Sequence, residues 1–403
     1  MPRSRSWLVV AATLTLCATT LVAHASNLSL DPTYSGDGVL RLKALDGAET
    51  YEVEVLGNKV YAAGIVFGSS PSQTFLARTN ADGTLDGSYG VGGVATLDAP
   101  GMVYGSRSVD FTDDGSAVVT YYAKHHLVIQ RWASDGSLDT KFSGDGIRQI
   151  AFATSKIHAV TRGAVDAQGR VVVAAQRDAQ RGFDALIYRL TPQGALDTSF
   201  SVDGVKRLDY FKWDWVDALT VDHNNRVIFA TDDTEDASTA RGYLIRLKPD
   251  GSTDTNFSDD GRVGLRLAPK MFTYPLAVGV DSHNVITAAL TGSSASTYGA
   301  ARVLTNGDLD PDYGDAGVLG VTCACLPRHA QVVDGAVAFD GILGDLQTVV
   351  ATRFSANGHG VFQGRIDLFP ATTNEWIDGV ALDGTHLFIG GSVGRDAYIA
   401  KID

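Results

Sequence analysis

Cysteine is scarce in this sequence of 403 residues, which contains only Cys17, Cys323 and Cys325. Because Cys17 lies in a predicted leader, two cysteines remain, and a disulfide framework cannot be what holds the fold together. Hydrophobic residues, which make up 44% of the chain, must do so. The Cys-Ala-Cys spacing leaves open a strained bridge between Cys323 and Cys325 or two buried thiols, of which we expect the thiols.

Positively charged side chains are also few, with 33 lysines and arginines against 46 aspartates and glutamates. The formal net charge is −13, and it becomes −15 when Arg3 and Arg5 are removed with the leader. A chain of this charge is repelled by phosphate backbones and by anionic lipid heads. We therefore expect no nucleic-acid partner.

The motifs of several enzyme classes are absent as well. The sequence has no His-Glu-x-x-His pair and no Gly-x-x-x-x-Gly-Lys loop. This argues against enzymes that depend on those motifs, but not against one that assembles its residues from separate repeats. Helical periodicity is also missing after the leader, so strand and turn signals decide the fold class.

The first 25 residues have the order of a secretory signal peptide. Arg3 and Arg5 precede an apolar run from Trp7 to Val22, and Ala23-His24-Ala25 supplies the small residues of a cleavage site. The run falls short of the roughly 20 residues that a membrane span needs. We therefore predict that residues 1–25 are removed and that residues 26–403 form a secreted or periplasmic protein without membrane insertion.

A nine-residue signature recurs throughout the chain. Its best copies are LDTKFSGDG from Leu138 and LDTSFSVDG from Leu196. Six copies begin at Leu30, Leu85, Leu138, Leu196, Thr253 and Leu309, at intervals of 53 to 58 residues. A regular period of this length predicts one repeat domain rather than several unrelated ones.

Each repeat is predicted to contain four short strands. In one repeat, apolar runs at 163–165 and 170–175 flank a turn at Gly169, a third run covers 185–190, and a fourth follows the signature at 205–208. The first two strands recur at 51–66, 108–121, 164–175, 219–230, 276–290, 331–343 and 379–391. Four antiparallel strands per repeat predict an all-β, seven-bladed β-propeller, with a degenerate seventh signature near residue 355.

The two ends of the chain predict how the ring closes. The chain begins on an outer-strand signature, Leu30 to Leu42, and ends on a third strand, Ala397 to Ile402. If the N-terminal strand completes the seventh blade, the ring closes with 3+1 strands and both edges are paired. Removal of residues 26–45 should then destabilise the whole array.

The signature L-D-x-x-F-x-x-D-G, followed by V-x-x-L and V-D-x-x-G-x-V-x-V-A, resembles the bacterial delta-60 repeat family. The resemblance covers nearly all of the chain after the leader. It implies an exported bacterial protein with propeller-like architecture, and it implies no catalytic residue and no common substrate.

The first aspartate of the signature is predicted to fix a turn. Its carboxylate can accept backbone N–H groups or ligate a cation, and we expect the turn role. Calcium is a minor alternative, for which Asp254, Asn256 and Asp260 are the best candidates. We otherwise expect no cofactor or metal. The aromatic residue of the signature is predicted to be an apolar plug between blades.

The loops that lead into each innermost strand converge around the channel of a propeller, where ligand sites gather. Here these loops are rich in aromatic and charged residues. The candidate ligand-binding residues are Tyr104, His158, Trp213, Trp215, Asp217, Tyr274, His329, Trp376 and Asp378. Trp215, Tyr274 and Trp376 share nearly one register. The alternative, that these rings only pack over the blade beneath, stays open.

An aromatic rim with carboxylates and cations suits a saccharide or a peptide. We therefore expect a monomeric, non-catalytic binding module for extracellular glycan or protein. One alternative is a hydrolase or lyase acting on an extracellular polymer, with His158, His329, Glu375 or Asp217 as acid or base. Another is a structural surface scaffold. Exposed rim aromatics would favour binding, and clustered acids with raised pKa values would favour catalysis.

Overall fold

The computed structural model describes residues 24–123, 125–151, 157–179, 182–208, 216–233, 241–269, 271–293, 297–322, 325–343, 348–369, 375–384 and 386–403. Strands and turns account for all the secondary structure in these ranges. Accordingly, none of the described residues belongs to a helix that is long and apolar enough to cross a membrane.

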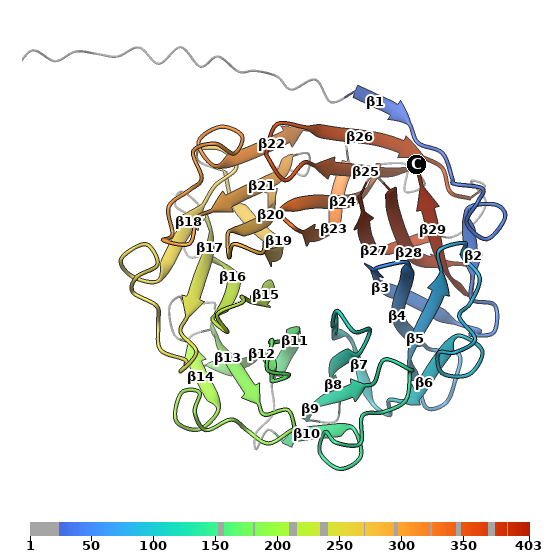
Figure 1. Ribbon diagram of the computed structural model, residues 1–403, viewed down its shortest axis with the longest axis horizontal. Helices are drawn as coiled ribbons and strands as arrows, with labels where there is room; N and C mark the ends of the chain where they lie inside the picture. The colour runs from blue at the N-terminus through green and yellow to red at the C-terminus, as the bar shows by residue number, and fades with distance from the viewer. Residues whose placement is uncertain are drawn as a thin grey trace, which may run out of the picture.

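The strands form seven sheets around a central axis (Figure 1). Blade 1 consists of β3 (Ala48–Leu56), β4 (Lys59–Val66), β5 (Gln73–Asn80) and β6 (Val94–Asp98), and blade 2 of β7 (Met102–Phe111), β8 (Ala117–Ala123), β9 (His126–Trp132) and β10 (Ile147–Ala151). Blade 3 consists of β11 (Ile157–Val165), β12 (Val171–Ala179), β13 (Gly182–Leu190) and β14 (Val205–Leu208). Blade 4 consists of β15 (Ala218–Val221), β16 (Val227–Asp233), β17 (Arg241–Leu247) and β18 (Arg262–Leu265).

Blades 5 to 7 continue the order around the ring. Blade 5 consists of β19 (Thr273–Val280), β20 (Ile286–Gly292), β21 (Thr297–Val303) and β22 (Val318–Thr322). Blade 6 contains β23 (Cys325–Val333), β24 (Ala336–Leu343), β25 (Val349–Phe354) and β26 (Val361–Ile366). Blade 7 consists of β27 (Glu375–Asp383), β28 (His386–Val393), β29 (Asp396–Ile402) and the N-terminal β2 (Val39–Arg41). Neighbours within these four-stranded sets are antiparallel. The predicted seven-bladed propeller is therefore confirmed.

The N-terminal segment closes the ring. β2 pairs with β29, with Leu40 opposite Ile399, and supplies the fourth strand of blade 7, so the 3+1 closure is confirmed. β1 (His24–Asn27) pairs in parallel with β26 and adds a fifth strand to blade 6, the blade without a signature. β1 thereby covers an edge that would otherwise be unpaired. The predicted cleavage after Ala25 falls inside β1, and the signal peptide stays a prediction.

The aromatic residue of each signature lies between two blades. All six are at most 1% exposed: Tyr34, Tyr89, Phe142, Phe200, Phe257 and Tyr313. Phe142, for example, packs against Gly194 in a turn of the next blade, where φ is +83° and a Cβ would lie 3.3 Å from the ring. A side chain at that glycine would be both strained and crowded. The predicted role as plugs is confirmed.

The signature aspartate fixes its turn, as predicted. Asp197 Oδ1 accepts the backbone N–H of Ser199 at 3.0 Å. The same bond occurs in the other five copies. A carboxylate that accepts the amide two residues later replaces a backbone contact in a tight turn.

A cation eight residues before five of the six signature aspartates joins neighbouring blades, and it was not predicted. Arg246 in β17 donates Nε to Asp254 Oδ2 at 2.9 Å and Nη1 to the Thr305 carbonyl of blade 5 at 2.7 Å, and its guanidinium lies 4.2 Å from the centroid of the Phe257 ring. The equivalent arginines are Arg78, Arg131, Arg189 and Arg302. At the ring closure, Lys401 pairs with Asp31. The arginine contacts, which we call the arginine clamps, tie each of blades 1 to 5 to the following blade.

Of the two remaining cysteines, the structure describes Cys325. It begins β23, the first strand of blade 6. Cys325 is disulfide-bonded, so the expectation of two buried thiols is wrong for Cys325. Cys323 lies outside the described residues.

Candidate functional site

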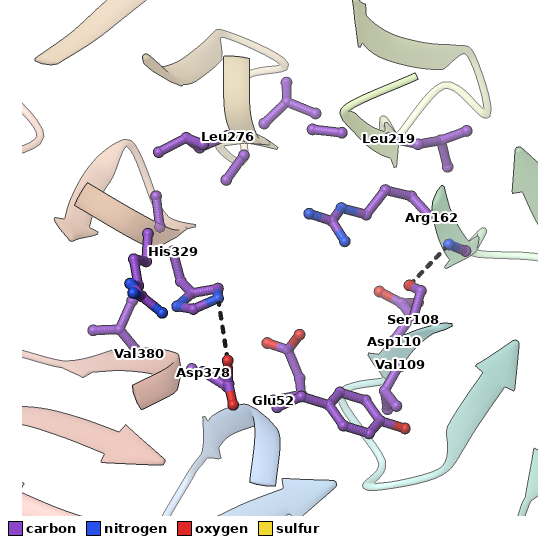
Figure 2. Close-up of a pocket in the computed structure, with 18 residues that line it drawn as sticks. Glu52, Ser108, Val109, Asp110, Arg162, Leu219, Leu276, His329, Asp378 and Val380 are labelled. Atoms are coloured by element: carbon purple, nitrogen blue, oxygen red, sulfur yellow. Dashed lines mark hydrogen bonds and ion pairs between the residues drawn. The ribbon is translucent and has the colours of Figure 1, made fainter. Parts of the chain in front are cut away.

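A cavity of about 200 Å³ lies in the central channel, and the innermost strands of all seven blades line it. Its polar side chains are Glu52, Ser108, Asp110, Arg162, Arg328, His329 and Asp378, from blades 1, 2, 3, 6 and 7, whereas blades 4 and 5 contribute Leu219 and Leu276. Figure 2 shows Glu52, Arg162 and His329 pointing into the same space. The cavity thus has a charged arc and an apolar arc.

β-Bulges place several of these side chains. The pairing between the first and second strands shifts by one residue at the same level of blades 1, 5, 6 and 7. The additional residues at these shifts are Tyr51, Leu276, Arg328 and Asp378, and all four line the cavity. A bulge redirects the side chain of the extra residue, and bulges are frequent beside functional sites.

Asp340 in β24 orients His329. The buried Asp340 carboxylate accepts the backbone N–H of His329 at 3.0 Å, and both of its oxygens lie 3.2 Å from His329 Nδ1. With Nδ1–H donated to Asp340, Nε2 faces the cavity, where Asp378 Oδ1 is 4.0 Å away (Figure 2). Burial lowers the pKa of His329, but the negative charges of Asp340, Asp378 and Glu52 outweigh it, so the pKa is raised.

The fold itself does not require a carboxylate at position 340. In the other described blades with the same one-residue shift, the position of Asp340 is occupied by Ala63, Ala174, Ala289 and Gly390. Burying a carboxylate costs free energy unless hydrogen bonds compensate for the lost water. Because the hydrogen bonds of Asp340 go to His329, its role is to hold the imidazole.

Burial shifts the pKa values of the channel acids toward neutrality. It raises the pKa of Glu52 to about 7 and that of Asp110 to about 7. Glu54 follows Glu52 on the same face of β3, and burial, reinforced by the charge of Glu52, raises its pKa to about 8. Gln331 bridges Glu54 and blade 7, donating Nε2 to Glu54 Oε2 at 2.5 Å and accepting the backbone N–H of Leu382 at 2.8 Å. Acids that exchange protons near pH 7 are therefore gathered in the channel.

The structure places some of the predicted site residues at the cavity and others away from it. His329 and Asp378 line the cavity, and Trp376 stands at its rim, 54% exposed, with the Arg328 guanidinium 5.7 Å from its ring centroid. Asp217 is not among the lining residues, because it is buried beside Asp232. That burial, with the negative charge of Asp232, raises the pKa of Asp217 to about 8.

The structure describes only some of the remaining residues of the predicted rim. The Tyr274 ring stacks on Phe272, with centroids 6.4 Å apart and planes 8° apart. Trp213 and Trp215 lie outside the described residues, and so do the side chains of Tyr104 in β7 and His158 in β11. The expected continuous patch of aromatic rings therefore stays a prediction.

The predicted calcium loop contains carboxylates that already face guanidinium groups. Asp254 accepts from Arg246, and Asp260 Oδ2 accepts from Arg262 Nη2 at 2.8 Å. The Asn256 backbone N–H donates to Asp254 Oδ1 at 3.3 Å. Calcium at this loop stays a prediction.

Sequence reasoning missed Glu52, Arg162 and Asp340. Asp340 has a signal that could have been used, because VAFDGIL at 337–343 aligns with VYAAGIV at 60–66 and places an acid where the other copy has alanine. Glu52 and Arg162 have no such signal, since polar residues are common on innermost strands that face a channel.

These features define a seven-bladed β-propeller with a titratable site in its channel. The chain matches the sequence model of a family described as a β-propeller domain of unknown function, DUF5122, over residues 58–89, 169–200 and 224–257. The match supports a β-propeller repeat family, and the narrower resemblance to the delta-60 repeat stays an expectation. No curated protein sequence matches the chain.

Solved structures with a similar fold have different functions. They include an oligogalacturonate lyase in complex with manganese (TM-score 0.52, 10% identity, 94% of this chain and 98% of that chain). Others are the polysaccharide lyase Uly1 (0.51, 9%, 87% and 89%) and the β-propeller domain of the Trilobed protease from Pyrococcus furiosus (0.50, 9%, 88% and 95%). At these identities the similarity shows the fold alone, and function has to be argued from the site.

Proposed function

We propose that the protein binds an extracellular glycan or protein at the mouth of its central channel. The observation that carries this proposal is the Asp340–His329 pair, in which a buried carboxylate directs an imidazole into the cavity. A purely structural role would give no reason for a carboxylate at a position that is alanine or glycine in equivalent blades. The extracellular setting rests on the predicted signal peptide.

The chemistry of the mouth suits a polar ligand with flat apolar faces. Toward a ligand, the guanidinium groups of Arg162 and Arg328 can donate hydrogen bonds in a plane, and the carboxylates of Glu52 and Asp378 can accept hydrogen bonds. The exposed Trp376 ring offers a stacking surface beside Arg328. Such sites combine a few orienting polar groups with aromatic contact area.

Acid–base catalysis on an extracellular polymer is a second candidate, favoured by the clustered acids. His329 and Glu52 face one cavity, and burial brings the pKa of Glu52 to about 7. Groups whose pKa lies near the working pH are effective proton donors and acceptors. The channel therefore has the groups that a hydrolase or lyase would need to move a proton.

A glycan and peptide array tests the proposed function and separates the two candidates. The purified protein is compared with His329→Ala and with His283→Ala, which removes an exposed turn histidine as a matched control. We expect binding that is lost in His329→Ala and kept in His283→Ala. Bound ligands are then incubated with the protein and analysed by mass spectrometry. Products that need His329 would indicate catalysis, and intact ligands would indicate binding alone.

Two array results would overturn the proposal. One is that the unaltered protein retains no glycan or peptide. The other is that the His329→Ala variant, checked for unchanged circular dichroism, retains the same ligands as the unaltered protein.

A further inference from the structure

Two exposed aromatic side chains meet in one groove. The exposed large hydrophobic residues among the described ranges are Phe67 (40%), Val91, Val202 and Trp376 (54%). The two valines occupy the same position of two outer signatures. Phe67 and Trp376, in contrast, come from blades 1 and 7 and line a groove of about 340 Å³ at the ring closure. Aromatic side chains in contact with solvent on both sides of a groove indicate a binding surface.

Backbone packing builds the groove. Gly47 N donates to the Arg395 carbonyl at 2.8 Å, and Phe67 N donates to the Gly47 carbonyl at 2.9 Å. The Arg395 guanidinium is fixed by two bonds to Asp46, at 2.6 and 2.7 Å. A Cβ at Gly68 would lie 2.3 Å from the Asp46 carbonyl oxygen, so a side chain there cannot fill the floor. The groove is therefore part of the folded ring.

The groove combines flat apolar surface with polar groups of both charge signs. Glu49, Ser392 and Arg395 line it together with Phe67 and Trp376. A pyranose ring presents C–H groups on its faces, which pack on aromatic rings, and hydroxyl groups at its edges, which both donate and accept hydrogen bonds. A wholly apolar ligand would strip water from Glu49 and Arg395 without replacing it. Neutral sugar rings match this lining.

The groove continues toward the channel. Trp376 belongs to the groove, and the Arg328 guanidinium over its ring lines the channel cavity. Asp378, two residues further along β27, lines the cavity as well. β27 and β3 lie side by side in the ring (Figure 1). An elongated ligand seated in the groove would therefore extend toward the channel.

We propose that the groove lined by Phe67 and Trp376 is a binding subsite for neutral sugar rings, and that it forms one elongated glycan site with the channel. The inference rests on the proposed function for its second half, the continuation into the channel. The groove itself is argued from its own residues.

Titration calorimetry with defined oligosaccharides tests the subsite. The probes are the hexamers of β-1,4-glucose, β-1,4-N-acetylglucosamine and β-1,4-mannose, and a proline-rich decapeptide serves as the competing class. We expect at least one hexamer to bind, and Phe67→Ala and Trp376→Ala each to weaken it about tenfold or more. Trp376→Phe should restore most of the affinity, because it keeps an aromatic face. Val202→Ala, which removes an exposed side chain elsewhere, should change nothing.

The outcomes distinguish the groove from the channel. If Phe67→Ala weakens binding and His329→Ala does not, the groove is a sugar site and the channel proposal fails. If only His329→Ala weakens binding, the channel is the site and the groove inference is wrong. The inference is also overturned if no hexamer binds, if Phe67→Ala behaves like Val202→Ala, or if the decapeptide alone occupies the groove.

Discussion

Replacing Arg246 by methionine should destabilise the propeller by about 3–5 kcal/mol, the cost typical of removing one partner of a buried ion pair. Arg246 is 1% exposed and Asp254 is 4% exposed. In the variant, Asp254 keeps the Asn256 backbone N–H and the Arg226 guanidinium, 3.8 Å away, and the Thr305 carbonyl loses its Arg246 donor. Methionine retains most of the aliphatic packing of the arginine side chain. The loss of stability therefore measures the contribution of the guanidinium group rather than that of the methylene groups.

Urea unfolding followed by tryptophan fluorescence and circular dichroism measures this loss. The matched control is Arg207→Met, because Arg207 pairs with Asp203 on the surface, where the side chains are 56% and 50% exposed. That variant should lose at most about 0.5 kcal/mol. Adding Asp254→Asn to Arg246→Met should recover stability, since no buried charge then lacks a partner. The clamp argument is refuted if Arg246→Met costs no more than Arg207→Met.

Three further predictions concern pH, closure and the site. Burial raises the pKa of Glu54 to about 8 from 4.5, so the folded protein keeps a proton that the unfolded chain releases. The free energy of unfolding should therefore fall as pH rises from about 5 to 8. Thermal melts of the Glu54→Gln variant over this range should show a shallower fall. Deleting residues 26–45 removes β2 from β29 and should lower the melting temperature of the whole ring in one transition. A separate small transition, with the main melting temperature unchanged, would contradict ring closure. Asp340→Asn should lower the pKa of His329 in an NMR titration assigned with His329→Ala, and an unchanged pKa would mean that Asp340 does not stabilise the charged imidazole.

Much of the fold was predictable because the repeat marks one place in each blade. The signature forms the turn between the third and fourth strands, as Leu196 to Gly204 does between β13 and β14, so its spacing counts the blades. The missing seventh signature was also predictable, and β25 and β26 are joined by a short turn closed by the Ser355 N to Gly360 carbonyl bond. What the sequence did not indicate was β1, whose four residues carry no strand pattern of their own.

The site was predictable only in outline, because it depends on contacts between distant strands. Loop composition singled out His329 and Asp378, which line the cavity, and Trp376, which lines the neighbouring groove. It also placed Asp217 beside Asp378 through the shared Trp-x-Asp pattern. Asp378 is the extra residue of a bulge and lines the cavity, whereas Asp217 precedes β15, donates its backbone N–H to the Ala230 carbonyl and lies beside Asp232. Asp232 belongs to another strand, so a local sequence pattern does not indicate this contact.

The same comparison separates the positions that hold the ring together from the positions that line the channel. At the outer turns, equivalent positions carry equivalent side chains, because an aspartate, an aromatic ring and a cation must meet to join two blades. At four of the inner bulges, equivalent positions carry Tyr51, Leu276, Arg328 and Asp378, although the register shift is the same. The bulge fixes where a side chain is presented and leaves its chemistry free. Substitutions at the bulges should therefore alter ligand choice at little cost in stability, whereas substitutions in the clamps should do the reverse.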